Sequence, residues 1–166
     1  GGDNDNQQCF PEQAWGKRYL TAPTSASTSA STFQFNTYKI IVKDLATQVR
    51  RNGTLLTGMN PAGYYEFVSN QAEYITADQP IMVAQFIHSG TACMVAGVGD
   101  PEMIYISPVE QGTKRIGFYR NNEENITVNF LTLVIPNGGI PSLRINGSAT
   151  FDHTYIHPRD PNYTVV

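Results

Sequence analysis

Short runs of β-branched and aromatic residues, each bounded by Asn, Gly, Pro or Asp, constrain the fold of this chain more than any other feature. Six such runs lie at residues 38–44, 64–70, 80–88, 102–109, 126–136 and 141–147. The nearest helical candidate, residues 70–79, has Tyr74 and Ile75 side by side and Pro80 behind it, which favours a strand followed by a turn. We therefore expect an all-β fold.

Charge excludes two classes of partner. Only 15% of the 166 residues are charged and the net charge is -3, so the clustered Lys and Arg that nucleic acids and anionic membranes require are missing. The longest apolar runs fall well short of the roughly 20 residues that span a bilayer. The first eight residues, "GGDNDNQQ", do not resemble a signal peptide. The sequence predicts a soluble segment without nucleic-acid binding or membrane insertion.

Residues 21–35, "TAPTSASTSASTFQF", interrupt the strand pattern. They are small and polar, and they offer little apolar surface to offset the entropy lost on ordering. We expect residues 21–32 to form an exposed Ser/Thr-rich loop between two strands.

Two similar stretches indicate an internal duplication. "TQVRRNGT" at residues 47–54 and "PSLRINGS" at residues 141–148 lie 94 positions apart, and apolar runs precede both at similar distances. We assign residues 1–14 to an N-terminal tail, residues 15–98 to a first β-repeat and residues 99–166 to a second, C-terminally incomplete repeat. The two repeats are expected to form one domain.

The Asn-Gly turns and the small size of each repeat predict how the two repeats fold together. Asn-Gly between alternating apolar residues is a strong hairpin signal, because a type I′ turn needs positive φ at both central positions. A repeat of a few short strands with one apolar face does not stay folded alone. We therefore expect a β-sandwich of short antiparallel strands, built from two internally duplicated halves. Because the second repeat is shorter, we also expect neighbouring domains of a longer chain to cover its edge strand.

Three segments, "WGKRYLTAP" (15–23), "YITADQPIMVAQF" (74–86) and "GDPEMIYISPVEQ" (99–111), resemble the N-terminal domain of the IgG Fc-binding protein family, and the resemblance runs from about Trp15 to the end. It implies an extracellular β-rich module in mucus-associated glycoproteins of animals and in surface adhesion proteins of bacteria, without a catalytic residue. The resemblance indicates where the protein acts but identifies no ligand. It is not evidence that antibody Fc is bound. The signature residues that it implies are expected to be structural: Asp78, Pro80, Gly99, Asp100, Pro101, Pro108, Glu110 and Gln111.

The acidic residues Asp100, Glu102 and Glu110, with Tyr105 among them, have two interpretations. Two carboxylates that flank a scissile bond at a defined separation would serve acid/base catalysis. Alternatively, Asp100 and Pro101 form a turn and a later proline ends the strand, which is the favoured interpretation.

The two histidines that are close in sequence, His153 and His157, lack the third ligand that a zinc site needs. Cys9 and Cys93 are not spaced to supply it, so the histidines are expected to be polar strand or loop residues. No loop carries a complete set of oxygen ligands for calcium. No metal or cofactor is predicted.

Cys9 and Cys93 either form a disulfide, which would stabilise the fold by about 4 kcal/mol through a long closed loop, or remain two independent thiols. Four asparagines precede x-Ser/Thr, and their N-glycosylation depends on the host: Asn52, Asn125, Asn146 and Asn162.

These features predict a noncatalytic extracellular module of a larger secreted or cell-surface protein that acts in adhesion or in protein and glycoprotein interaction. Loops, or exposed aromatic residues such as Tyr64, Tyr65, Tyr119 and Tyr155, would carry binding. Two alternatives are a lectin-like carbohydrate-binding module, with an aromatic platform beside Asn and Asp, and a glycosidase-like enzyme that uses the acidic residues.

Overall fold

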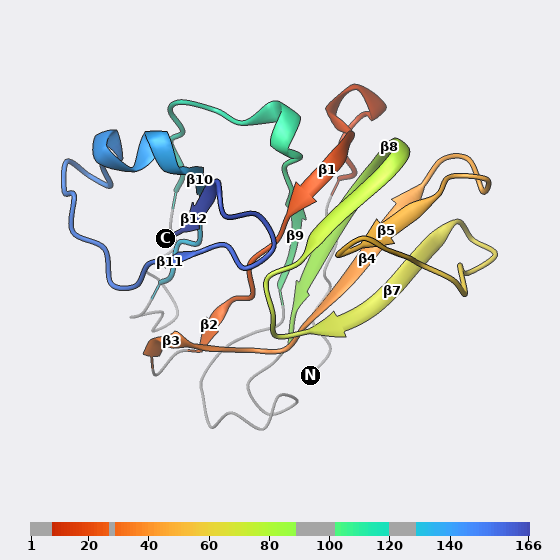
Figure 1. The fold of residues 1–166 in the computed structure, drawn as a ribbon, viewed down its shortest axis with the longest axis horizontal. Coiled ribbons are helices and arrows are strands. Elements are labelled where there is room, and N and C mark those ends of the chain that lie inside the picture. Colours follow the sequence, from red (N-terminus) through yellow and green to blue (C-terminus); the bar gives the residue numbers. More distant parts are fainter. Residues whose placement is uncertain (1–7, 27–28, 89–101, 120–128) are drawn as a thin grey trace.

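A computed structural model describes residues 8–26, 29–88, 102–119 and 129–166 (Figure 1). The named strands in these ranges all pair antiparallel. The helices in the same ranges are three short 3-10 segments, η1 (Glu12–Ala14), η2 (Val109–Gln111) and η3 (Asn137–Ser142). None of the helices in the described residues has the length and apolar character to cross a membrane. The all-β prediction is confirmed.

The strands form one large sheet, one small sheet and a hairpin. The large sheet has the order β6-β5-β8-β4-β7, and β1 and β9 also pair with β8. Its strands are β1 (Gly16–Leu20), β4 (Asn36–Val42), β5 (Val49–Arg51), β6 (Thr54–Leu55), β7 (Tyr64–Ser69), β8 (Tyr74–Ile87) and β9 (Glu102–Ile106). The other strands are β2 (Ser25–Ala26) and β3 (Ser29–Phe33), which form the hairpin, and β10 (Val134–Pro136), β11 (Tyr155–Ile156) and β12 (Tyr163–Val165), which form the small sheet.

Strand β8 is the centre of the large sheet. Its first residues pair with β1 and β5, and residues 81–87 pair with β4 and β9. Between these two parts, residues 78–80 have no ladder partner, and the register with β1 jumps from Arg18↔Thr76 to Gly16↔Ile81. The expected turn is therefore a bend within one continuous strand. Pro80 is tolerated at the bend because its missing N–H is not needed by a ladder there.

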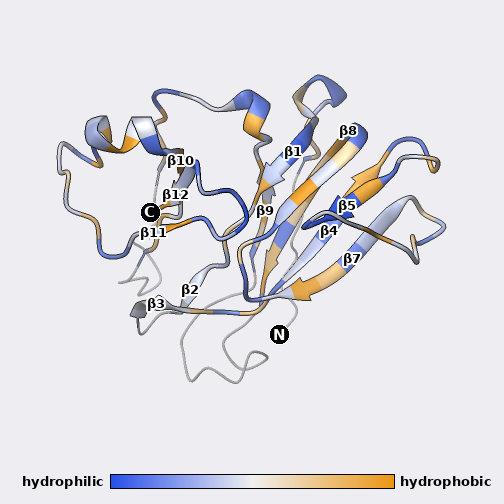
Figure 2. Cartoon of the chain, in the orientation of Figure 1, coloured by the Kyte–Doolittle hydropathy of each residue, from blue (hydrophilic) through white to orange (hydrophobic). Residues whose placement is uncertain are grey.

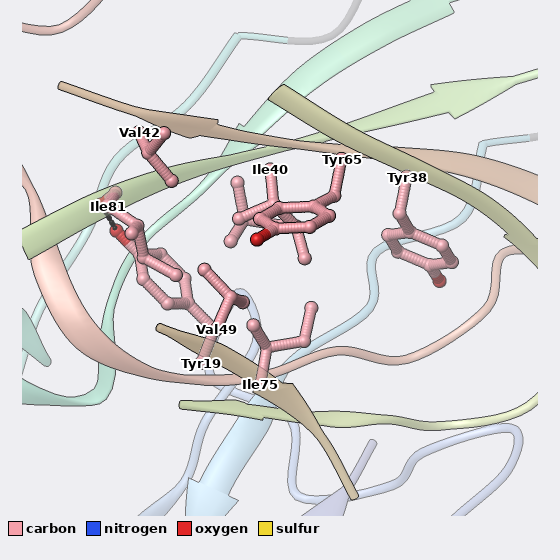
Figure 3. Close-up of a cluster of buried hydrophobic side chains, with 9 residues drawn as sticks. Tyr19, Tyr38, Ile40, Val42, Val49, Tyr65, Ile75 and Ile81 are labelled. Carbon is pink, nitrogen blue, oxygen red and sulfur yellow. Dashed lines mark hydrogen bonds between the residues drawn. The ribbon is translucent and has the colours of Figure 1, made fainter. Parts of the chain in front are cut away.

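The hydrophobic core lies between strands of the large sheet. Buried residues alternate with partly exposed ones along β4, so Tyr38, Ile40 and Val42 share one face. Figure 3 shows Ile40 and Tyr65 pointing towards Val49 and Ile75 across this core. Figure 2 shows hydrophobic residues recurring along β8 and gathered towards the end of β7, whereas η1 is hydrophilic. Burying side chains of this kind contributes roughly 1.5–3 kcal/mol each.

Residues 129–166, which we call the C-terminal segment, contain the small sheet. This sheet lies beside the large one, on the side where β1 and β9 run (Figure 1). In the first repeat β4 pairs with β7, and in the second β10 pairs with β12; β4 and β10 precede the Asn-Gly turns of their repeats, and β7 and β12 follow them. This shared pairing is compatible with the duplication, which stays a prediction. The prediction of a strand at residues 141–147 is wrong. The helix η3 runs to Ser142 and contains Pro141, which lacks the N–H that a strand ladder needs.

Both Asn-Gly turns have the predicted backbone. Asn52 and Gly53 have φ of 52° and 85° and join β5 to β6. Asn146 and Gly147 have φ of 49° and 83° inside the bridge that joins Ile145 to Ser148. Positive φ at both central residues is what the type I′ turn requires, and asparagine tolerates it better than other non-glycine residues.

The Ser/Thr-rich segment differs from the exposed loop that was expected. Thr21, Ala22 and Pro23 are buried, and the residues after them form the β2–β3 hairpin. Thr21 N donates to Glu73 O at 2.9 Å, and Nε2 of His157 lies 3.1 Å from Thr21 O. The start of this segment therefore joins the large sheet to the C-terminal segment.

Candidate functional site

The end of β9 packs directly against β1. Gly16 is buried, and a Cβ at this position would lie 2.2 Å from Cβ of Pro108, so only glycine fits. Arg18 Nε donates to Oε1 of Glu110 at 3.1 Å. This exposed ion pair joins the two segments at the surface and adds little stability.

A further contact extends this packing to the residues before β1. Gln111 Nε2 donates to the backbone carbonyl of Gln13 at 3.1 Å. Trp15 lies between Gln13 and β1, and its indole Nε1 donates to the carbonyl of Phe10 at 3.1 Å. The segment that carries Trp15 is therefore held on both sides.

The bend in β8 positions a second segment, the turn between β4 and β5. Asp78 Oδ1 accepts from Gln48 N at 2.9 Å, and Asp78 N donates to Gln48 O at 3.3 Å. Lys17 Nζ donates to the Asp78 carbonyl at 2.7 Å. Asp78 thus ties the bend to β1 and to the residue that follows the β4–β5 turn.

These segments line an open surface cavity of about 290 Å³, which we call the Trp15 cavity. Glu12 and Trp15 line it from the N-terminal segment, and Gln79 and Pro80 line it from the bend in β8. The β4–β5 turn contributes the remaining lining residues, Lys43, Asp44 and Thr47. This volume is at the lower end of small-molecule sites, roughly 300–1,000 Å³.

The Trp15 cavity contains both hydrogen-bond donors and hydrogen-bond acceptors. Lys43 Nζ donates to Glu12 Oε2 at 2.7 Å, so these two charges neutralise each other. Asp44 Oδ1 accepts from Ala46 N at 2.9 Å. Thr47 is only 4% exposed, and its hydroxyl has no hydrogen-bond partner among the described residues. The wall thus combines an aromatic ring, donors and acceptors, and the Thr47 hydroxyl is buried behind it.

A second cavity of about 250 Å³ lies between the β2–β3 hairpin and the C-terminal segment. Phe33, His153 and Tyr155 line it, and their ring centroids are 5.5 to 6.1 Å apart. Burial raises the pKa of Tyr155 to about 12, so its hydroxyl stays protonated at neutral pH. That hydroxyl is buried without a partner in the part of the chain that the structure describes.

Glu73 forms a buried polar centre that sequence reasoning missed. It is 1% exposed, and its carboxylate accepts hydrogen bonds from Arg51, Asn52 and, at 2.6 Å, Ser69 Oγ. Burial opposes ionisation, but the hydrogen bonds from Arg51, Ser69 and Asn52 outweigh it and hold the pKa of Glu73 below its ordinary value. The guanidinium of Arg51 also lies 4.1 Å from the ring centroid of Phe67. Glu73 is therefore an ionised structural carboxylate.

Asn52 also serves this centre. Its Nδ2 donates to Glu73, and its Oδ1 accepts from Tyr74 N at 2.9 Å. A glycan on Nδ2 would therefore attach beside a buried carboxylate. Asn146 is exposed at its turn, and the exposed Asn162 donates from Nδ2 to Asp160 Oδ1 at 2.9 Å. Asn125 lies outside the described residues, and glycosylation at all four sites stays a prediction.

His157 lies in a loop, as predicted, but it is buried at 1% exposure. Its Nδ1 accepts from Arg159 N at 3.2 Å, so Nε2 carries the hydrogen that points to the Thr21 carbonyl. Burial lowers the pKa of His157 and favours this neutral form. In the described ranges, no group of three or more His, Cys, Asp or Glu is placed to hold a metal.

Of the carboxylates considered for catalysis, Glu102 and Glu110 lie at or beyond opposite ends of β9. Glu102 begins β9 and Glu110 follows its end, and a five-residue strand separates its ends by about 13 Å. Glycosidase carboxyl pairs are roughly 5–9.5 Å apart. Glu110 is moreover paired with Arg18. Gly99, Asp100 and Pro101 lie outside the described residues.

The remaining predicted residues are scattered. Cys9 is an exposed free thiol whose Sγ lies 3.3 Å from the hydroxyl of Tyr105, and Cys93 lies outside the described residues, so the disulfide stays a prediction. Tyr65 belongs to the core, and Tyr64 is half-buried on β7. Tyr119 is 88% exposed and lies near the exposed Ile116 and Phe118. These aromatic residues do not form one platform.

The family model described as "IgGFc binding protein" matches residues 1–166, the whole chain. No curated protein and no solved structure matches the chain. Among the residues that the sequence singled out, Pro80 lines the Trp15 cavity, whereas Asp78, Pro108 and Gln111 contact the segments beside it. The cavity itself had no sequence signal beyond the single tryptophan.

Proposed function

Because the chain belongs to the IgGFc binding protein family over its whole length, we propose that it is a noncatalytic module that binds a protein or glycoprotein partner. The family description makes antibody Fc the first partner to test. We place the module outside the cell, in a longer secreted or cell-surface protein whose role is adhesion or glycoprotein interaction. Neighbouring domains of that chain would complete its surface.

The Trp15 cavity carries this proposal. Its walls include or contact residues that the family resemblance singled out, among them Asp78, Pro80 and Gln111. Tryptophan is enriched where proteins bind ligands, because it buries a large apolar area and offers one polar group. A site whose walls are already fixed loses little entropy on binding. The signature residues thus support binding indirectly, by positioning Trp15.

Surface plasmon resonance with the immobilised chain tests the proposal. Antibody Fc and a panel of secreted glycoproteins would be passed over the wild type, Trp15→Ala and Tyr119→Ala. We expect Trp15→Ala to weaken the binding of the partner by about 30-fold or more, as for a central hot spot. Tyr119→Ala is the matched control, an exposed aromatic residue away from the cavity, and should bind like the wild type.

Two results would count against the proposal. If no protein of the panel binds at micromolar concentration, the binding role is not supported. If Tyr119→Ala abolishes binding and Trp15→Ala does not, the partner contacts the exposed segment at residues 112–119 instead of the cavity.

A further inference from the structure

We propose that Asn146 is a site of spontaneous deamidation, and that the fold protects the other two asparagines that precede glycine, Asn52 and Asn137. The inference concerns a covalent modification and does not rest on the proposed binding function. The three Asn-Gly pairs of the chain carry the same reactive groups. They differ in how the folded chain holds the asparagine side chain.

The reaction needs only the two residues and water. The backbone N of Gly147 attacks Cγ of Asn146 and forms a bond to it, and Nδ2 leaves as ammonia with the hydrogen of the Gly147 amide. Water then opens the cyclic imide at one of its two carbonyl groups. Opening at the side-chain carbonyl leaves an aspartate, and opening at the main-chain carbonyl leaves an isoaspartate. Glycine favours the attack because it has no Cβ beside the nitrogen.

The structure leaves Asn146 able to react in this way. It is exposed, and in the described part of the chain its side chain has no hydrogen bond. Its turn is closed by one isolated bridge, in which Ile145 and Ser148 exchange backbone hydrogen bonds of 2.9 Å. The attack requires this turn to open, since Cγ must meet the N of Gly147. Opening is easiest where few contacts hold the backbone, as at this exposed bridge outside any strand ladder.

Asn52 provides a matched comparison within the same chain. Its turn has nearly the same positive φ angles as the turn at Asn146. Its carboxamide, however, is held at both ends: Nδ2 donates to the buried Glu73, and Oδ1 accepts from Tyr74 N at 2.9 Å. The turn also joins two paired strands of the large sheet. Reaction at Asn52 would break both hydrogen bonds, and the one to a carboxylate is of the strong, charge-assisted kind.

Asn137 is protected by other contacts, although it is exposed like Asn146. Its Nδ2 donates to Pro161 O at 2.8 Å, and its Oδ1 accepts from Thr164 Oγ1 at 2.9 Å. Its backbone N donates to Asn162 O at 2.9 Å. These hydrogen bonds tie the carboxamide to β12 and to the loop before it. Exposure alone therefore does not distinguish Asn146, whereas its lack of side-chain hydrogen bonds does.

The modification would change the C-terminal segment at one point. Either product adds a negative charge, and an isoaspartate lengthens the main chain by one atom. The bridge between Ile145 and Ser148 would then lose its register. Nδ2 of Asn146 is also the atom to which a glycan would attach, so N-glycosylation and deamidation at this residue exclude each other.

Peptide mass spectrometry tests the inference. The wild-type chain from a bacterial host, where Asn146 carries no N-glycan, would be incubated at mildly alkaline pH and body temperature. Trypsin cleaves after Lys114 and Arg144, which puts the three Asn-Gly pairs on separate peptides. The mass gain of each peptide measures deamidation, and electron-transfer fragmentation identifies isoaspartate. We expect Asn146 to react at least about 30-fold faster than Asn52 or Asn137, the effect of two hydrogen bonds.

Two controls separate the fold from the local sequence. In concentrated urea all three pairs should react at rates within about threefold of one another, because unfolding removes the protecting hydrogen bonds. Thr164→Val has nearly the shape of the wild-type side chain but lacks the hydroxyl that donates to Asn137. It should raise the rate at Asn137 about 3- to 10-fold and leave the rate at Asn146 unchanged.

Three outcomes would overturn the inference. One is a rate at Asn146 in the folded chain that is equal to or below the rate at Asn52 or Asn137. Another is the same preference for Asn146 in urea, since the surrounding sequence and not the fold would then set it. The third is an unmodified Asn146 in the folded chain after the time in which the unfolded chain has reacted at all three pairs. None of these outcomes bears on the binding of a partner.

Discussion

Replacing Glu73 with glutamine tests the buried polar centre most directly. The carboxylate accepts hydrogen bonds from Arg51, Asn52 and Ser69, all donors. Glutamine has nearly the same shape, but its NH₂ group would face one or more of these donors. It would also leave the guanidinium of Arg51 without its counterion. The substitution therefore changes hydrogen bonding and charge without creating a cavity.

The expected loss in the free energy of unfolding follows from the burial of the pair. Removing one partner of a buried ion pair costs roughly 3–5 kcal/mol. The Arg51 side chain is 30% exposed, so water recovers part of its solvation, and we expect the lower end, about 3 kcal/mol. For a chain of this size that corresponds to a fall in Tm of about 6–12 °C. Thermal unfolding followed by circular dichroism, with urea unfolding at 25 °C, measures both quantities.

A matched control is available on the same sheet. Lys39 and Glu66 form an exposed cross-strand pair at 3.3 Å. Glu66→Gln should change the free energy of unfolding by less than about 1 kcal/mol. The reasoning would be refuted if Glu73→Gln cost no more than this control. The difference between Glu73→Gln and the wild type should also shrink at acid pH. Because the folded pKa of Glu73 is lowered, its contribution is present above the ordinary value and is lost as the pH falls through the folded one.

Three further predictions concern single residues. Gly16→Ala should destabilise the chain by about 2 kcal/mol in urea unfolding, because its Cβ would meet Pro108 at 2.2 Å, whereas Gly117→Ala, with nothing within 4 Å, should not. Asn146→Ala should cost about 1 kcal/mol, measured as a lower Tm, since alanine disfavours a φ of 49°. Burial lowers the pKa of His157, so its contribution to stability is present above its ordinary pKa of 6.5 and is lost as the pH falls through the folded value. A urea midpoint that stays constant from pH 7.5 to 5.0 would contradict this.

Features fixed by neighbouring residues were predictable from the sequence. The strands at 38–44, 64–70 and 102–109 were expected within a few residues of β4, β7 and β9, because alternation is a local property. The backbone of both Asn-Gly turns was also predicted, since few residues other than asparagine and glycine accept positive φ.

Features that depend on distant parts of the chain were not predictable. Glu73 resembles a surface residue in its sequence, and its burial depends on donors at Arg51 and Ser69. The Trp15 cavity likewise needs three segments that meet only after β8 has bent. At residues 141–147 the local pattern predicts a strand, but Pro141 cannot donate to a ladder and lies in η3.

The bend in β8 has a consequence for insertions and deletions. Ile75 lies before the bend and Ile81 and Val83 lie after it, yet all three belong to one core. Within residues 81–87, which pair with β4 and β9, a residue lost or gained would shift the register and turn the following side chains to the other face. Residues 78–80 have no ladder partner, so a change of length there breaks no strand pairing directly. The bend is thus the part of β8 where a change of length would be tolerated most readily.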